Sequence, residues 1–419
     1  MPKVPQSTSS FQAAYISERQ ISEESGSETS RKSKKLFASS SLNNNDEIRI
    51  AVQHQDLYVL PCKSSPHICG RLTKADGITA AEATNFVNNA ICHLFEEIRY
   101  ELNAMEIDRC KNVGVSTLMK NYIFQSPSQT FLLEHAGWIF QENGKITDDA
   151  GYFDLSIPLI MILGFAEDYQ RIIINAKHKL ILTRSHNDNN VVLQAQPAQG
   201  VQAEDFKISL TKLEWMISYV KVADSRKVQL LNYNAQDIAT PMSFRAWELY
   251  EYPMLARTSK HVWVVKCSTQ LEKPRFVIVG FQSSRRNQIT NNASKFDHCT
   301  IRDAKLFLNS QSYPYGNLHL DITHNQYSQL YNTYTDFQTF YYGKEPEPLL
   351  NRDAFLKTAP LIVIDCSKPN KFLKTGPVDI RLEFELTQIF PYTTAAYCLI
   401  LHDRIIEYHP LSGGVKKMI

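Results

Sequence analysis

The stretch Val-Asp-Ile-Arg-Leu-Glu-Phe-Glu-Leu, residues 378–386, alternates apolar and charged side chains without interruption. A period of two is that of a β-strand with one face on a core and the other in water. Apolar runs at 361–364 and 395–401 flank this stretch, and the second is apolar throughout, as in a strand covered on both faces. Gly376-Pro377 and Pro391 stand between the runs, where turns are required. We therefore expect packed antiparallel β-structure in this part of the chain.

The composition suits two β-rich domains. At 419 residues the chain is too long for one small core, and 43% hydrophobic residues are enough to build two. Aromatic residues make up 11%, including 20 Tyr and 21 Phe, and flat rings pack well on sheets. Lys and Arg total 45 against 43 acidic residues, so the net charge of +2 lacks the basic excess of a dedicated nucleic-acid-binding protein.

Cysteine usage and the lack of targeting signals favour an intracellular protein. The eight cysteines are scattered beside apolar runs, as expected for small, reduced core residues. The first 30 residues are polar, so no signal peptide is predicted. The longest apolar stretch, near 157–165, contains Pro158 and Gly164 and is too short to span a bilayer, so we expect no membrane segment.

Residues 1–46 are predicted to form a disordered tail, because they are rich in Ser, Gln, Glu and Asn and carry few apolar clusters. The tail contains a short basic run whose cationic members are candidates for a weak nucleic-acid contact or a nuclear-import signal. These residues are Arg31, Lys32, Lys34 and Lys35. The alternative is a solvated charge run, since Glu23, Glu24 and Glu28 lie in the same tail.

Strand-like segments fill the remainder and divide into two units. A first jelly-roll domain is predicted over 47–195, with a helix near 115–124. The low-complexity piece at 196–205 is predicted to be a linker. A second domain over 206–412 would hold eight strands, the number that a jelly roll requires, with a partly helical insertion near 325–357. The predicted fold class is all-β: two tandem jelly rolls, each an antiparallel β-sandwich, with short helical insertions and a disordered N-terminal tail.

The first strand after the predicted linker carries an irregularity. Leu213, Trp215, Ile217 and Tyr219 alternate with polar residues, whereas Ile208 and Leu210 lie one step out of phase. A β-bulge near Lys212 would bring both sets to the same face of the strand.

Several blocks of the chain resemble a known family. The segment 98–108, followed by Asn112-Val113-Gly114-Val115, is similar to the first-domain hairpin of double jelly-roll-like proteins of insect and other invertebrate genomes. The resemblance covers roughly 47–410, but Asn103-Ala104 stands where Asn-Gly would suit a tight primed turn. The later blocks that carry it are Ile157-Pro158-Leu159, Leu163-Gly164-Phe165 with Asp168-Tyr169, residues 378–384, Ala396-Tyr397-Cys398-Leu399-Ile400, His402-Asp403-Arg404 and Glu407-Tyr408.

That family is related to the double jelly-roll major capsid proteins of Polinton (Maverick) elements and large DNA viruses. The resemblance implies a structural, self-assembling, capsid-like protein and not an enzyme, encoded by a Polinton-type element or retained by a host as an endogenous viral element. It implies a homotrimer whose neighbours tile a shell, and it offers no catalytic, cofactor-binding or metal-binding residues. The location would be the virion if the element is active, and otherwise the cytoplasm or nucleus.

Two alternatives from other functional classes remain. One is a β-sandwich module of the host that binds a sugar or a peptide without assembling. The other is a non-haem iron oxygenase, because His319-Leu320-Asp321 matches the start of a two-histidine, one-carboxylate site that His402 or His409 would complete. Such a short match arises easily by chance in a chain with 12 His, so iron is the weaker alternative.

Cys62, His67 and Cys69, with Cys92 or His93 nearby, form the nearest approach to a zinc cluster. The spacing Cys-x4-His-x-Cys departs from zinc-finger patterns, whose paired ligands stand about two to four residues apart. Two small buried thiols around a turn at Pro66 are the favoured interpretation, so no metal site is predicted.

For three charged segments, a structural position at the surface is favoured over a functional role. Arg285-Arg286 and Lys416-Lys417 could contact phosphate, but solvated loop positions are expected. His402-Asp403-Arg404 looks like a fragment of a catalytic triad, yet neighbours in a strand point to opposite faces, so it is predicted to form a turn and rim.

Aromatic residues supply the candidates for contacts between subunits. Trp247, Tyr250 and Tyr252 form one such group, and the cluster at 331–342 forms a second. Core packing is the alternative for each of them.

Overall fold

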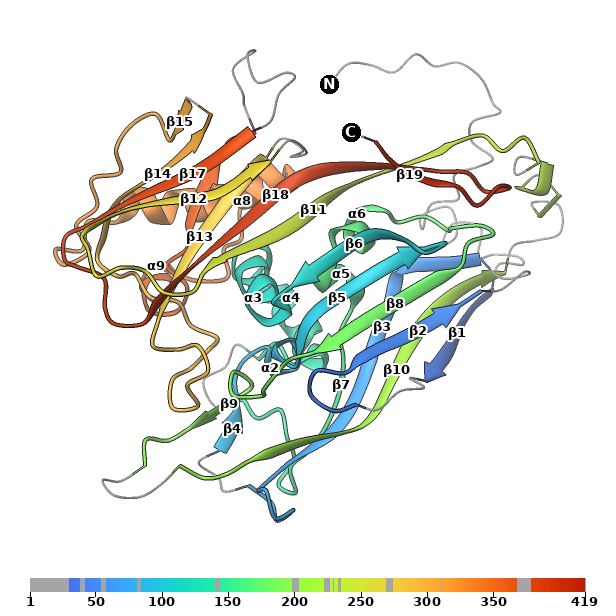
Figure 1. Ribbon diagram of the computed structural model, residues 1–419, viewed down its shortest axis with the longest axis horizontal. Coiled ribbons are helices and arrows are strands. Elements are labelled where there is room, and N and C mark those ends of the chain that lie inside the picture. The colour runs from blue at the N-terminus through green and yellow to red at the C-terminus, as the bar shows by residue number, and fades with distance from the viewer. Residues whose placement is uncertain are drawn as a thin grey trace.

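Two antiparallel β-sandwiches lie side by side, one from each half of the chain, with short helices between them (Figure 1). The computed structural model describes residues 30–37, 42–53, 58–80, 84–139, 144–197, 203–221, 227–268 without 229, 233 and 234, 274–309, 311–367 and 378–418. The all-β, double jelly-roll prediction is confirmed by the strand order of both sandwiches.

The first sandwich has eight main strands in two sheets, ordered β1-β10-β3-β7 and β2-β8-β5-β6. Counted along the chain within this sandwich, the orders are first-eighth-third-sixth and second-seventh-fourth-fifth, which is jelly-roll topology. The strands are β1 (Ser30–Phe37), β2 (Glu47–Val52), β3 (Tyr58–Thr73), β5 (Phe95–Leu102), β6 (Met105–Lys111), β7 (Tyr152–Ser156), β8 (His178–Arg184) and β10 (Lys207–Lys221).

The second sandwich repeats the same order, as β11-β18-β13-β16 and β12-β17-β14-β15. A further strand, β19 (Val415–Met418), pairs with β18 and lengthens its sheet over the first sandwich (Figure 1). The main strands are β11 (Thr240–Tyr252), β12 (Lys260–Ser268), β13 (Pro274–Ser283), β14 (Ile301–Leu308), β15 (Gln311–Tyr313), β16 (Ile362–Asp365), β17 (Val378–Leu386) and β18 (Thr394–Tyr408).

Short helices and one extra ribbon lie between the strands. The predicted insertion near 325–357 is largely helical, and the helix predicted near 115–124 is confirmed as α3. The ribbon is β4 (Thr84–Phe86) with β9 (Val192–Gln194), and the helices are α2 (Ala90–His93), α3 (Val113–Phe124), α4 (Pro127–Thr130), the 3-10 helix Phe131–Ala136, α5 (Leu159–Ile162), α6 (Gly164–Asp168), α8 (Ser328–Tyr342) and α9 (Arg352–Thr358).

Strand β17 shows how the alternating pattern becomes a core. Ile380, Leu382, Phe384 and Leu386 are at most 4% exposed, whereas the charged residues between them face outward. A slip of one residue would place those charges in the core, so the register of β17 is fixed by burial. One apolar cluster runs without a break through both sandwiches, which therefore share a core.

The predicted boundary between the domains is wrong by one strand. The segment after the predicted linker at 196–205 forms β10, which pairs with β3 from Lys207↔Thr73 to Val220↔Tyr58 and completes the first sandwich. The second sandwich begins with β11 and not at residue 206. Alternation identifies a strand but not its sheet, because the pairing partner lies far away in the sequence. The bulge predicted near Lys212 is confirmed by the register shift between Leu210 and Lys212.

The predicted disordered tail is wrong for residues 30–37, while residues 1–29 lie outside the described part of the chain. Residues 30–37 form β1, which pairs antiparallel with β10 from Ser30↔Lys221 to Phe37↔Glu214. This is the first strand of the first jelly roll and lies at the edge of its sheet. Edge strands are commonly rich in charge, which prevents pairing between molecules, so β1 lacks the apolar alternation that reveals inner strands.

The predicted hairpin at 98–108 is confirmed. Strands β5 and β6 pair antiparallel around the two residues Asn103 and Ala104. Both have positive φ, 48° and 67°, which is the conformation of a type I′ turn even though alanine takes the usual place of glycine.

Candidate functional site at the junction of the two jelly rolls

The long strands β11 and β18 belong to the second sandwich and extend across the first. They pair over their full common length, from Thr240↔Tyr408 to Tyr252↔Ala396, and β11 contacts α6 and β6 of the first sandwich. Figure 1 shows β11, β18 and β19 passing over β5 and β6. Side chains along these strands therefore meet side chains of the first sandwich, and the surface on which they meet is called the junction here.

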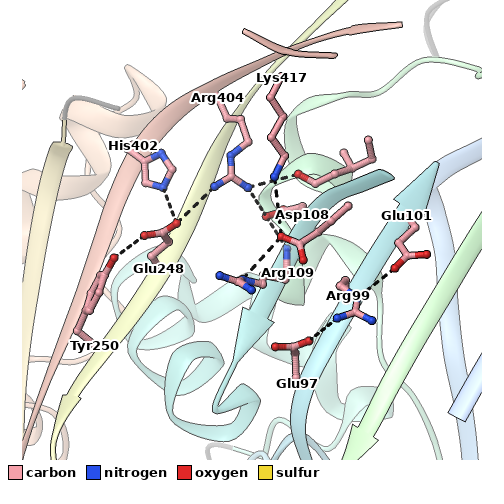
Figure 2. A network of polar contacts seen from close by, with 12 residues as sticks. Glu97, Arg99, Glu101, Asp108, Arg109, Glu248, Tyr250, His402, Arg404 and Lys417 are labelled. Atoms are coloured by element: carbon pink, nitrogen blue, oxygen red, sulfur yellow. Dashed lines mark hydrogen bonds and ion pairs between the residues drawn. The ribbon is translucent and has the colours of Figure 1, made fainter. Parts of the chain in front are cut away.

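Arg404 of β18 connects two carboxylates from different sandwiches at the junction (Figure 2). Its guanidinium lies 3.8 Å from Asp108 Oδ1 of β6 and 3.5 Å from Glu248 Oε1 of β11, and it donates to the carbonyl of Ile107. Tyr250 donates to Glu248 Oε2 at 2.7 Å, while His402 Nε2 lies 3.7 Å from Oε1. The network joins β6, β11 and β18.

Asp108 is the buried member of this network. Its side chain accepts hydrogen bonds from the backbone N–H groups of Arg109 and Phe165, both at 2.9 Å, so it also fixes the start of α6. Burial raises the pKa of Asp108, although Arg404 and the two N–H donors act in the opposite direction. Burial and the hydrogen bond to Glu248 likewise raise the pKa of Tyr250. Removing Arg404 would leave a buried carboxylate poorly compensated.

A second contact across the junction is bidentate. Arg245 of β11 donates from Nε and Nη2 to the two carboxylate oxygens of Asp168 in α6, at 2.8 and 2.5 Å, and its backbone N–H donates at 2.7 Å. The same guanidinium lies 3.5 Å from the centre of the Tyr341 ring. Burial lowers the pKa of Arg245, but the hydrogen bonds that its guanidinium donates to Asp168 outweigh this effect and raise the pKa overall. The forked geometry of Arg sets both distance and angle between α6 and β11.

Gly164 allows this close approach. A Cβ atom at this position would lie 1.7 Å from the backbone carbonyl oxygen of Arg245 and 3.3 Å from the Trp247 ring. Only a residue without a side chain lets α6 reach the backbone of β11. The block Leu163-Gly164-Phe165 with Asp168 thus lies at the junction.

Helix α8 also connects the two sandwiches. Tyr334 donates to the carbonyl of Tyr122 at 3.0 Å, and the Gln338 side chain donates to carbonyls at the end of α3. Phe124 packs edge-on against Trp247, Phe337 and Tyr341. These contacts join α3 of the first sandwich to the insertion and β11 of the second.

Most of the aromatic residues proposed for contacts between subunits therefore make contacts within the chain instead. Trp247 is buried at the junction, and Tyr334 of the 331–342 cluster is buried as well. Tyr250 is bound to Glu248, and Tyr252 packs edge-on against Trp263. Core packing, the alternative for these residues, describes Trp247, Tyr334 and Phe337, whereas Phe340 and Tyr342 are 53% and 41% exposed.

The predicted nucleic-acid residues lie on an ordered strand and not on a free arm. Arg31, Lys32, Lys34 and Lys35 belong to β1, and their backbones pair with residues 216–220 of β10. Contact with nucleic acid through these residues stays a prediction.

The histidine and cysteine candidates are only partly brought together. Cys62 belongs to a separate apolar cluster, and Cys92 and His93 are buried in α2. His67 and Cys69 lie together with Asp154, which sequence reasoning missed because β7 is far along the chain. Within the described residues this is the one group of three or more metal-binding side chains, so His319 and Asp321 do not form a site with His402 or His409. Asp321 instead contacts His324 at 2.7 Å.

Of the remaining charged candidates, Arg285, Arg286 and Lys417 have carboxylate partners. Arg285 makes a bidentate contact with Asp297, at 2.9 and 2.7 Å, and Arg286 contacts Glu251. Lys417 lies 4.0 Å from Glu106 across the junction. The turn predicted at 402–404 is wrong, because β18 continues through it and directs His402 and Arg404 into the junction.

None of the helices in the described ranges has both the length and the apolar character needed to cross a bilayer.

Comparison with known proteins assigns the fold to a family. The chain is similar to a chain of the Sputnik virophage structure, with TM-score 0.62 and 9% identity over 93% of this chain and 88% of the other. It is similar to the mavirus major capsid protein, with TM-score 0.57 and 10% identity over 100% and 96%, and to VP54 of the virus PBCV-1, with TM-score 0.57 and 10% identity over 94% and 97%. No curated protein matches. The double jelly roll-like domain family matches residues 84–406, and the chain belongs to that family.

Proposed function

We propose that this protein is a structural, self-assembling, capsid-type protein that works as a homotrimer. The observation that carries the proposal is its likeness to the mavirus major capsid protein, which extends over 100% of this chain and 96% of that one. The proposed origin is a Polinton-type element or a descendant that a host genome has retained. The proposed location is the virion, or the cytoplasm or nucleus where no virion forms.

The contacts at the junction favour a structural role for the protein over a catalytic one. Its charged groups are paired with one another across the two sandwiches, and its glycine and aromatic residues fill space. A rigid unit of two jelly rolls presents fixed outer faces, which is what closed, repeated contacts between copies require.

Edge strand β12 offers a surface for a second copy of the chain. It ends the sheet β12-β17-β14-β15, and Val262 and Val264 on its outward side are each 57% exposed. Covering exposed apolar side chains and free strand edges favours association. We propose that β12 contributes to contacts within the trimer, and that the basic residues of β1 contact nucleic acid in a shell.

The test is the mass and shape of the purified full chain. Light scattering after size-exclusion chromatography should give three times the 48.0 kDa chain mass, and negative-stain microscopy should show three-lobed particles. The double variant Val262→Lys/Val264→Lys should lower the trimer fraction, while Val228→Lys, at an equally exposed valine elsewhere, should not. A chain that stays monomeric at high concentration would overturn the proposal.

That outcome would favour the alternative, a module that binds a sugar or peptide without assembling. An open groove of about 820 Å³ gives such a ligand a place to bind. It is lined by residues of both sandwiches, including Asn88, Tyr122, Lys145, Ser294 and Lys295.

A further inference from the structure

We propose that His67, Cys69 and Asp154 form a binding site for a zinc ion on the outer face of the first jelly roll. The three side chains come from β3 and β7, and their potential ligand atoms all lie within 4.8 Å of one another. The proposed zinc site does not depend on whether the chain assembles, and metal binding is not part of the function proposed above.

The sheet register places these side chains on one face. Cys69 lies directly opposite Asp154 of β7 on one side and next to Lys212 of β10 on the other. His67 lies two residues earlier on β3, so it points to the same face, and it pairs with Glu214. The intervening Ile68 is fully buried, which shows that the cluster faces outward.

The distances suit a tetrahedral ion. Cys69 Sγ lies 3.6 Å from His67 Nε2 and 3.7 Å from Asp154 Oδ1. With metal–ligand bonds of about 2.0–2.3 Å, the edges of a tetrahedron with these donors measure about 3.4–3.6 Å. His67 Nε2 and Asp154 Oδ1 are closer, at 2.5 Å, and because the Asp154 side chain is exposed, its rotation is enough to open that edge.

Glu214 holds the imidazole in the orientation that ligation requires. Its carboxylate, which is 0% exposed, lies 3.2 Å from His67 Nδ1, on the side of the ring opposite to Cys69 and Asp154. A histidine that binds a metal commonly donates its other N–H to a carboxylate, which fixes the tautomer and leaves Nε2 as the free donor. Lys212 lies 2.9 Å from Glu214 and balances the buried charge. Glu214 is thus a positioning residue and not a ligand.

The donor set selects the class of metal. Imidazole nitrogen and thiolate sulfur suit zinc, whereas calcium and magnesium require oxygen ligands. Three protein ligands leave a fourth position to water. Because β7 is the edge strand of its sheet, an ion held by both strands would fasten that edge to β3.

The experiment uses the full chain, reduced and freed of metal, titrated with Co²⁺ as a spectroscopic probe and then with Zn²⁺. We expect one equivalent of Co²⁺ to give a sulfur-to-metal charge-transfer band and the visible absorption of a four-coordinate ion, both abolished by one equivalent of Zn²⁺. Zn²⁺ should also raise the unfolding temperature.

Four variants separate the site from adventitious binding. Cys69→Ser should remove the charge-transfer band, and Asp154→Asn should weaken Zn²⁺ binding at least tenfold. Glu214→Gln should weaken it by about 10- to 100-fold without removing the band. Asp353→Asn is the matched control, since Asp353 is 74% exposed and Asp154 73%. Far-ultraviolet circular dichroism of each variant tests that it folds. Absence of the band in a folded chain, or its persistence in folded Cys69→Ser, would overturn the proposal.

Discussion

At the scale of single residues, the β5–β6 turn contains an unfavourable alanine. Ala104 has φ of 67°, a left-handed conformation that costs an L-residue about 1 kcal/mol and glycine little. We expect Ala104→Gly to raise the free energy of unfolding by about 0.5–1 kcal/mol, measured from the midpoint of urea unfolding at unchanged slope.

The neighbouring residue provides the control for that substitution. Asn103 accepts a hydrogen bond from Lys177 N–H at 2.8 Å and donates to the Gly413 carbonyl at 2.9 Å. Asn103→Gly keeps the turn conformation but loses both bonds, so it should lower stability. A lower midpoint for Ala104→Gly would show that the turn is not the source of strain.

Two buried histidines predict how stability depends on pH. Burial lowers the pKa of His93 to about 4 and that of His178 to about 3, and His178 Nδ1 also lies 2.6 Å from the Tyr100 hydroxyl. Below the ordinary histidine pKa of about 6.5, the unfolded chain binds protons that the folded chain does not. The stability that these groups contribute is therefore complete above that pKa and is lost as the pH falls toward 4 and 3.

Each histidine should contribute a slope of up to about 1.4 kcal/mol per pH unit within its window. Urea unfolding at a series of pH values measures this slope. His178→Gln should make it shallower, and His186→Gln, at an exposed position, should leave it as it is. An unchanged slope in His178→Gln would contradict the assignment.

At the scale of elements, the contact of α6 with β11 depends on one missing side chain. A methyl group at Gly164 would overlap the Arg245 carbonyl, and backbone cannot move aside as a flexible side chain can. We expect Gly164→Ala to lower the free energy of unfolding by about 3 kcal/mol and to speed proteolysis between the sandwiches.

Gly316→Ala is the control for this substitution, because its added Cβ would meet nothing within 4 Å. Equal stability of the two variants would show that α6 does not press on β11 as described. The resemblance had already marked Leu163-Gly164-Phe165 as a family block. Its role became visible only when α6 was placed against a strand some 80 residues later in the chain.

At the scale of the whole molecule, the first jelly roll depends on β1. Removing residues 1–38 would expose the edge of β10, whose backbone pairs with β1 over eight positions. We expect that truncation to lower the unfolding temperature and to increase aggregation, because an uncovered inner strand pairs with other chains.

Removing only residues 1–29 leaves β1 in place and should change neither property. Differential scanning calorimetry and light scattering measure both truncations. If removal of 1–38 were as harmless as removal of 1–29, β1 would not be a working part of the sandwich.

The sequence by itself determined the strands that alternate and the all-β class of fold, although the eight strands counted after residue 205 included β10 of the first sandwich and missed the short β15. Those properties follow from a period of two, which is local and can be read in a few residues. The β10 segment was correctly identified as a bulged strand, yet its assignment to the second sandwich was wrong.

Only the tertiary structure decided which strands share a sheet and which side chains meet. Pairing of β10 with β3, and of β1 with β10, joins segments far apart in the chain, and no local pattern specifies such partners. The meeting of His67 with Asp154, and of Arg245 with Asp168, follows from that pairing. A polar edge strand and a charged pair between sandwiches leave no periodic apolar signal, because burial on one face is what creates that signal.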